Sequence, residues 1–210
     1  MPRGRNQRPT NVEYYRRNRE QELFRVKARQ AGTRDMLREW RAVPCADCGK
    51  RYEPHQMDFD HRDPSAKRFN LMTGRAMLMS TAKLRDEAAK CDVVCVNCHR
   101  IRTQALWIGR QRKGKYTTPA GWRRMVAWQD RRDLVDRLRD QPCADCNERL
   151  PITAMEFDHR DPATKSFTIS RMLTHASLDE IRIEAAKCDV VCANCHRMRT
   201  YRRRHPLERE

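Results

Sequence analysis

Cysteines occur in this sequence in two groups whose internal spacing differs by a single residue. Each group contains two C-x-x-C pairs separated by a longer stretch of chain. Two such pairs supply four thiolates, which is the ligand set of a closed, tetrahedral structural zinc site. The spacing therefore predicts two structural Zn²⁺ ions, one bound by Cys45, Cys48, Cys95 and Cys98, and the other by Cys143, Cys146, Cys192 and Cys195.

One cysteine in each group remains outside this ligand set. Cys91 and Cys188 each begin the string CDVVC, and we expect them to be small buried side chains on a strand rather than reactive thiols or ligands. The alternative for the other eight cysteines is that they are buried or linked in disulfides. Five cysteines per group cannot pair evenly, which favours the metal interpretation.

Each group also carries an Asp-His pair, in the string FDHRDP, and a His directly after its last cysteine. An Asp on a strand can bind a hard cation, while the adjacent His faces the other way and can act as a base. A cation shared by this Asp and the later His would form a one-metal hydrolytic site. Two alternatives stay open: these His residues satisfy a compact core, or the later His is a zinc ligand. The residues concerned are Asp60, His61 and His99, with Asp158, His159 and His196.

A tandem duplication positions these residues. The segments Glu87–Thr103 and Glu184–Thr200 differ at two of seventeen positions. The upstream strings PCADC and FDHRDP recur 98 residues later, whereas the downstream block recurs 97 residues later, so one residue has been lost between them. Each copy spans about sixty residues, a size at which a bound metal is usually needed for a stable fold.

Hydrophobic spacing predicts the elements around the two copies. Asn11–Arg41 and Trp122–Asp140 have helical spacing, with a break near Gly32 in the first, and Gly109–Gly121 is typical of an exposed linker. A further helix is expected from His99 onward. We predict an α+β fold with two small zinc-binding domains, joined and preceded by basic helical segments: 1–40 N-terminal segment, 41–105 first domain, 106–138 linker with helix, 139–204 second domain, and 205–210 tail.

Composition indicates a polyanionic partner. The 210 residues carry 45 Lys and Arg against 28 Asp and Glu, a net charge of +17, and hydrophobic residues make up only 39%. Residues 1–40 and 104–141 each carry a net charge of +6. We expect no membrane span, because no run reaches the roughly 20 apolar residues required. The polar first residues predict no secretory signal, and therefore a reducing compartment such as the cytoplasm.

The string CADC…MDFDHRDPSAK…EAAKCDVVCVNCHRIRT resembles the HNH (His-Asn-His) endonuclease family, of the zinc-ribbon type with a ββα-metal fold. The resemblance covers residues 45–103 and 143–200. It implies a DNA endonuclease that hydrolyses phosphodiester bonds, leaving 5′-phosphate and 3′-hydroxyl ends, with His61 and His159 as general bases. It further implies catalytic Mg²⁺ or Mn²⁺ ions held by Asp60 and His99, and by Asp158 and His196.

The sequence departs from this family at one position. The family's middle Asn usually lies nine residues before the helix His, where this chain has Lys90 and Lys187. This departure favours an alternative function, a non-catalytic or partly vestigial zinc-ribbon accessory protein that binds nucleic acid. Intact Asp-His and Cys-His pairs in both copies favour the enzyme.

Arginines near the two Asp-His pairs are suited to phosphate contacts, because guanidinium is planar and permanently charged. Their alternative role is solvated surface. We expect duplex DNA to be contacted mainly through its backbone, by a monomer that acts as a covalent pseudo-dimer and nicks DNA or cuts both strands. The resemblance suggests the cytoplasm of a bacterial or phage-infected cell. The candidate phosphate contacts are Arg62, Arg100, Arg102, Arg160, Arg197 and Arg199.

Overall fold

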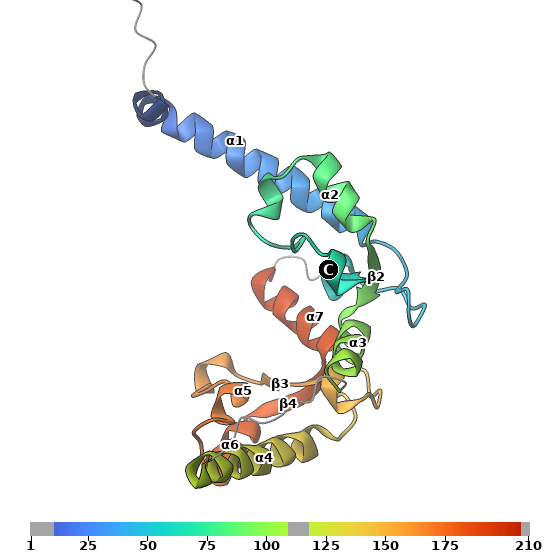
Figure 1. Cartoon of the computed structure of the whole chain (residues 1–210), viewed down its shortest axis with the longest axis vertical. Coiled ribbons are helices and arrows are strands. Elements are labelled where there is room, and N and C mark those ends of the chain that lie inside the picture. Colours follow the sequence, from blue (N-terminus) through green and yellow to red (C-terminus); the bar gives the residue numbers. More distant parts are fainter. Residues whose placement is uncertain (1–10, 109–117, 207–210) are drawn as a thin grey trace, which may run out of the picture. The chain divides into compact units, whose positions relative to one another are not determined.

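The computed structural model describes residues 11–108 and 118–206 (Figure 1). Residues 1–10 of the predicted N-terminal segment, 109–117 of the predicted linker and 207–210 of the predicted tail lie outside the described residues. The fold is α+β, with two separate two-stranded sheets, as the sequence predicted. The chain forms two compact units, residues 1–43 with 59–92 and residues 44–58 with 93–210.

Each copy of the repeat builds one sheet. The strands β1 (Met57–His61) and β2 (Cys91–Cys95) pair in the first copy, and β3 (Met155–His159) and β4 (Cys188–Cys192) pair antiparallel in the second. The predicted strand CDVVC is therefore confirmed in both copies. Side chains alternate along a strand, so the Asp and the His of each Asp-His pair lie on opposite faces.

Helix α1 (Asn11–Trp40) and helix α2 (Thr81–Ala88) belong to the first unit. The predicted break near Gly32 is wrong, because α1 continues through this residue. The irregular backbone lies instead at Asn18, whose side-chain amide donates to the carbonyl of Tyr14 at 2.9 Å and so competes with the helical hydrogen bond. The last turns of α1 are held by a core around the fully buried Leu37 and Leu84.

Helix α4 (Pro119–Arg139) leads into the second copy and confirms the predicted helix over Trp122–Asp140. Proline at its first turn and the side chain of Thr118, which accepts from the Gly121 N–H at 3.1 Å, define its start. Its buried Leu134 joins a core with residues of α5 (Ile169–Met172) and α6 (Leu178–Ala185).

Helices α3 (Val96–Ile108) and α7 (Ala193–Arg204) follow the second strand of each sheet. Both begin before the expected histidine, so the last cysteine pair spans the strand end and the first helical turn. Figure 1 shows the β3–β4 pair between α7 on one side and α4 and α6 on the other, in agreement with their contacts. Among the described helices, none has both the length and the apolar composition needed to cross a membrane.

Candidate functional site

Two groups of four cysteines come together as the spacing predicted. In each group the four sulfur atoms lie within 4.8 Å of one another, and the groups are Cys45, Cys48, Cys95 and Cys98, and Cys143, Cys146, Cys192 and Cys195. All ten cysteines of the chain are free thiols. Tetrahedral Zn–S bonds of about 2.3 Å place sulfurs about 3.8 Å apart, so each group fits a zinc ion.

The turn in each C-x-x-C pair is shaped to hold its sulfurs. Gly49 and Asn147 adopt left-handed backbone conformations, with φ of 69° and 56°, directly after the second cysteine of the pair. Glycine pays no steric cost there, and asparagine is among the residues that tolerate this region. Their N–H groups donate to the carbonyls of Cys45 and Cys143, at 2.9 Å each.

The thiols of the second group interact with one another through hydrogen bonds. Hydrogen bonding from the Cys195 thiol, more than any other cause, lowers the pKa of Cys192 to about 5 against the opposing effect of burial. The pKa of Cys195, which holds the proton in that bond, is raised. Backbone N–H groups also donate to the sulfurs, as from Cys192 to Cys143 at 3.2 Å. A metal ion bound by all four sulfurs would displace the remaining thiol protons.

The two remaining cysteines are buried on their strands, in the environment expected for them. Cys91 and Cys188 are 8% and 7% exposed, and burial raises the pKa of each thiol to about 11. Their sulfurs lie 3.5 Å from the carbonyls of Glu87 and Glu184. A thiol that stays protonated at neutral pH is a poor nucleophile and ligand.

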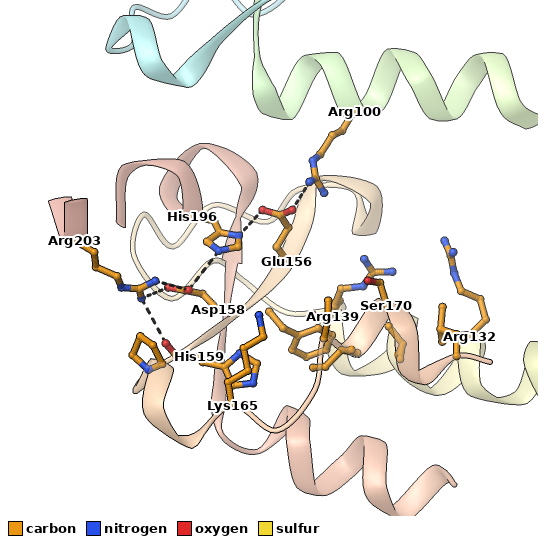
Figure 2. Close-up of a pocket in the computed structure, with 16 residues that line it drawn as sticks. Arg100, Arg132, Arg139, Glu156, Asp158, His159, Lys165, Ser170, His196 and Arg203 are labelled. Atoms are coloured by element: carbon orange, nitrogen blue, oxygen red, sulfur yellow. Dashed lines mark hydrogen bonds and ion pairs between the residues drawn. The ribbon is translucent and has the colours of Figure 1, made fainter. Parts of the chain in front are cut away.

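The second copy gathers its three predicted catalytic residues around one pocket of about 500 Å³. Asp158 and His159 from β3 and His196 from α7 all line this pocket (Figure 2). The Nε2 atom of His196 is 3.3 Å from Oδ1 of Asp158, so an oxygen and a nitrogen ligand lie side by side. This donor pair suits Mg²⁺ or Mn²⁺, which bind few protein ligands and retain water.

Glu184 orients His159 and was missed in the sequence. Its carboxylate is only 2% exposed and accepts from Nε2 of His159 at 2.8 Å. Burial alone would raise the pKa of Glu184, but the Lys187 ammonium and the N–H groups of Phe167 and Ser166 help to bring it to about 2. An ionised carboxylate can only accept, so Nε2 of His159 carries a proton, and in the neutral ring the lone pair is on Nδ1.

The first copy repeats this arrangement within its own unit. Glu87 is 1% exposed and accepts from Nε2 of His61 at 2.8 Å. It also accepts from the backbone N–H groups of Arg68 and Phe69, at 2.7 and 3.3 Å. Asp60 and His61 belong to the first compact unit, whereas His99 belongs to the second.

Lys90 and Lys187 bind the carboxylates that orient His61 and His159. Lys90 donates to Glu87 at 2.7 Å and to the carbonyl of Ala66 at 3.1 Å, which ties α2 to the loop after β1. Lys187 donates to Glu184 at 2.7 Å and likewise reaches the carbonyl of Thr164. The Glu–Lys pair therefore braces the loop that follows the Asp-His pair.

A second pair of carboxylates holds the helix histidines, by which we mean His99 and His196. Oε2 of Glu156 lies 2.6 Å from Nδ1 of His196, and Oδ2 of Asp58 lies 3.0 Å from Nδ1 of His99. Burial would raise the pKa of Glu156, but its bond to His196 and the charge of Arg100 lower it overall. A carboxylate on one ring nitrogen with the other nitrogen directed to a metal is the usual surrounding of a metal-binding histidine.

Arginines occupy the oxygens of Asp158. Arg203 contacts both of them, at 2.8 and 2.6 Å, and Arg199 contacts Oδ2 at 3.1 Å. Burial raises the pKa of this carboxyl, but the hydrogen bonds from Arg203 and Arg199 outweigh it and keep the pKa below its usual value. Asp158 is therefore an ionised carboxylate whose negative charge is balanced by cationic partners.

All six candidate phosphate contacts have protein partners. Arg62 and Arg160 donate to the carbonyls of Cys91 and Cys188, the first residues of β2 and β4, at 2.8 Å. They also pair with Asp92 and Asp189. The other four pair with carboxylates: Arg102 with Asp47, Arg199 with Asp145 and Asp158, Arg100 with Glu156, and Arg197 with Asp58. The side chains of Arg62 and Arg160 remain about half exposed, so they can still reach a ligand.

Signals for the missed carboxylates were present in the repeat. Glu87 and Glu184 stand in the identical string EAAKC, three residues before the lysine. Asp58 and Glu156 are acidic in both copies and lie two residues before the Asp of the Asp-His pair, hence on the same face of the strand. An acidic residue that recurs in both copies at the same distance from the same neighbouring residue is a stronger indication of a structural role than its residue type alone.

The fold and these sites define an α+β protein with two four-cysteine groups, each of which could hold a metal ion such as Zn²⁺. Neither a protein-family model nor a curated protein matches this chain, and no solved structure matches it either. The class therefore rests on the residues and geometry described above.

Proposed function

We propose that this chain is a divalent-metal-dependent DNA endonuclease of the HNH type, with one ββα-metal site in each copy of the repeat. The observation that carries the proposal is the pocket of the second copy. There Asp158 and the Nε2 atom of His196 lie 3.3 Å apart, and His159 lines the same pocket with Nε2 engaged by Glu184. His159 thus has one nitrogen held by a carboxylate, and His196 has a carboxylate at each nitrogen, Glu156 at Nδ1 and Asp158 at Nε2.

In this mechanism the chain's residues position one water and one phosphate. Asp158 and His196 would hold Mg²⁺ or Mn²⁺, which supplies charge stabilisation at the scissile phosphate and the leaving 3′ oxygen. The Nδ1 atom of His159 takes a proton from the attacking water, whose oxygen forms the new bond to phosphorus. Glu184 stabilises the imidazolium that results, because its carboxylate faces the Nε2 proton.

Basic side chains at the pocket support a polyanionic substrate. Arg132, Arg139 and Lys165 line it together with Arg203. On binding, a phosphate oxygen would replace Asp158 as the partner of Arg203, and a divalent ion would replace Arg203 as the partner of Asp158. Charge of this kind gives affinity that falls steeply with salt and carries no base specificity.

A specific observation favours the alternative, a zinc-containing protein that binds nucleic acid without cutting it. Both oxygens of Asp158 are bound by arginine, so an Arg–Asp structural pair would leave no position for a cation. Lys90 and Lys187 no longer favour this alternative, because they bind the carboxylates that orient His61 and His159.

A supercoiled-plasmid assay distinguishes the two functions. We expect the zinc-loaded protein to nick or linearise the plasmid in Mg²⁺ or Mn²⁺ and to be inactive in excess EDTA. His61→Ala and His159→Ala should each remove cleavage by one site, and the double variant should be inactive. His175→Ala, which changes an exposed histidine away from both Asp-His pairs, is the matched control and should retain activity. Gel shifts in EDTA with no cleavage by wild type over a range of metals and salt would establish the alternative.

A further inference from the structure

Two arginine–carboxylate pairs connect the copies of the repeat reciprocally. Arg100, on α3 of the first copy, pairs with Glu156 on β3 of the second (Figure 2). Arg197, on α7 of the second copy, pairs with Asp58 on β1 of the first, with Nη1 2.6 Å from Oδ1. All four residues lie in the second compact unit. Each arginine directly follows a helix histidine in the sequence, so the two contacts are equivalent by the repeat.

Each of these carboxylates also holds the helix histidine of its own copy. Glu156 contacts Arg100 through Oε1 and Nδ1 of His196 through Oε2. Asp58 offers Oδ2 to Nδ1 of His99, and Arg197 of the other copy contacts both Asp58 oxygens, at 2.6 and 3.2 Å. An arginine from one copy therefore reaches the histidine of the other through a single shared carboxylate.

The backbones next to these pairs are joined with the same symmetry. The N–H of Asn97 donates to Oδ1 of Asn194 at 3.2 Å, and the N–H of Asn194 donates to Oδ1 of Asn97 at 3.1 Å. Both asparagines are buried. A contact in which the same patch of each partner is used twice is isologous, the form found at two-fold dimer interfaces. Within the second compact unit, helices α3 and α7 are thus packed with the symmetry of an internal dimer.

We propose that each copy of the repeat supplies a positioning residue to the site of the other copy. Arg100 fixes Glu156, and this carboxylate fixes the orientation of the His196 ring through its contact with Nδ1. The arginine of the second copy does the same for His99. The role of the helix histidines as metal ligands rests on the proposed function, whereas the positioning of their rings does not.

Shared use of the two carboxylate oxygens explains why the arginine matters. Glu156 is partly exposed, with 22% of its side chain accessible, so it is not held by burial alone. With Arg100 present each oxygen has one partner, and the carboxylate has a defined plane. Without Arg100 the side chain can turn one or both oxygens to water, and the His196 ring loses its fixed orientation. Loss of such an outer contact typically weakens metal binding about tenfold to a hundredfold.

Long-range ¹⁵N–¹H NMR of the histidine rings tests the positioning directly, with the full-length, zinc-loaded chain. We expect Arg100→Gln to shift and broaden the ring signals of His196 while those of His99 stay unchanged. Arg197→Gln should have the reverse effect. Arg100→Lys, which retains the positive charge and one donor nitrogen, should bring the His196 signals part of the way back to those of wild type. Arg171→Gln, at an exposed arginine away from both pairs, is the matched control and should change neither ring.

A second measurement connects the positioning to metal binding and cleavage. In the background Asp60→Asn, in which only the second site keeps its proposed ligands, Arg100→Gln should weaken Mn²⁺ binding, followed by electron paramagnetic resonance, and nicking by about tenfold or more. Arg197→Gln should change both by less than about twofold. In the background Asp158→Asn the two arginine variants should exchange their effects.

The outcomes separate this inference from the proposed function. An arginine variant that disturbs only the histidine of its own copy, or neither histidine, would overturn the inference even if the protein cleaves DNA. Crossed effects on the two rings in a protein that neither binds Mn²⁺ nor nicks DNA would sustain the positioning and refute the endonuclease. Equal weakening of both sites by either arginine variant would also overturn it, since that result indicates a general loss of structure.

Discussion

Removal of the Glu184 carboxylate should have effects that differ sharply between two substitutions. Oε1 accepts from His159 and from the N–H groups of Ser166 and Phe167, at 2.8, 2.9 and 3.1 Å, whereas Oε2 accepts from Lys187 at 2.7 Å. Glu184→Ala leaves two backbone donors without an acceptor. Each such donor costs about 1–3 kcal/mol, so the free energy of unfolding should fall by about 3–5 kcal/mol.

Glu184→Gln keeps an oxygen at the Oε1 position, but it loses the negative charge and replaces the Oε2 acceptor of Lys187 with an amide N–H donor. The lysine is partly exposed and can regain water, so we expect a loss of about 1–2 kcal/mol. The amide no longer stabilises a charged His159, and turnover in the His61→Ala background should fall by roughly tenfold to a hundredfold. The KM for DNA should change little, because Glu184 is buried beneath the pocket and does not reach a substrate.

Urea unfolding followed by circular dichroism at pH 7, with zinc present, measures the stabilities, and single-turnover nicking measures the chemical step. Asp179→Asn is the matched control, since Asp179 lies on the same helix with its side chain 85% exposed. It should change the free energy of unfolding by less than about 0.5 kcal/mol. Equal losses for Glu184→Ala and Glu184→Gln would refute the assignment of the backbone N–H groups to this carboxylate.

Three further predictions concern metals and pH. The purified chain should bind two zinc ions, and Cys188→Ala should still bind two; a lower zinc content measured by metal analysis would make this thiol a ligand. Because hydrogen bonds, above all from Lys90, lower the pKa of Glu87 from 4.5 to about 2 against the effect of burial, its contribution to stability is complete above about pH 5 and is lost as the pH falls towards 2. The stability gap between wild type and Glu87→Gln should therefore close in acid, and a gap that stays constant would contradict the low pKa. Arg203→Leu should tighten Mn²⁺ binding at Asp158 severalfold, and unchanged affinity by calorimetry would show that the arginine does not compete.

The zinc ligands could be predicted from the sequence because their chemistry depends on local spacing. A C-x-x-C pair fixes two sulfurs within one turn, and duplication of the whole set identified which pairs belong together. The strands could be predicted for the same reason, since CDVVC is short, β-branched and placed between two invariant features of the repeat. Helix α4 followed from its apolar spacing alone.

Residues that act through long-range contacts could not be found in this way. Glu87 lies 26 residues from His61, and no local pattern indicates that its carboxylate faces inward. The break expected at Gly32 failed for a related reason: propensity is a weak local signal, and packing of the buried Leu37 a few residues later outweighs the cost of one helical glycine, about 1 kcal/mol.

The six arginines illustrate how the same residue type changes its interpretation once its partners are known. From the sequence, each was a cation near a candidate site, and phosphate contact was the natural expectation. In the fold, Arg100 and Arg197 face carboxylates of the other copy, so their charge is used within the protein. Each of these arginines directly follows a helix histidine in the sequence. The duplicated segment therefore contains both a helix histidine and the arginine that positions the helix histidine of the other copy. A substitution at either arginine is therefore expected to affect the helix histidine of the other copy rather than the histidine that precedes it in the sequence.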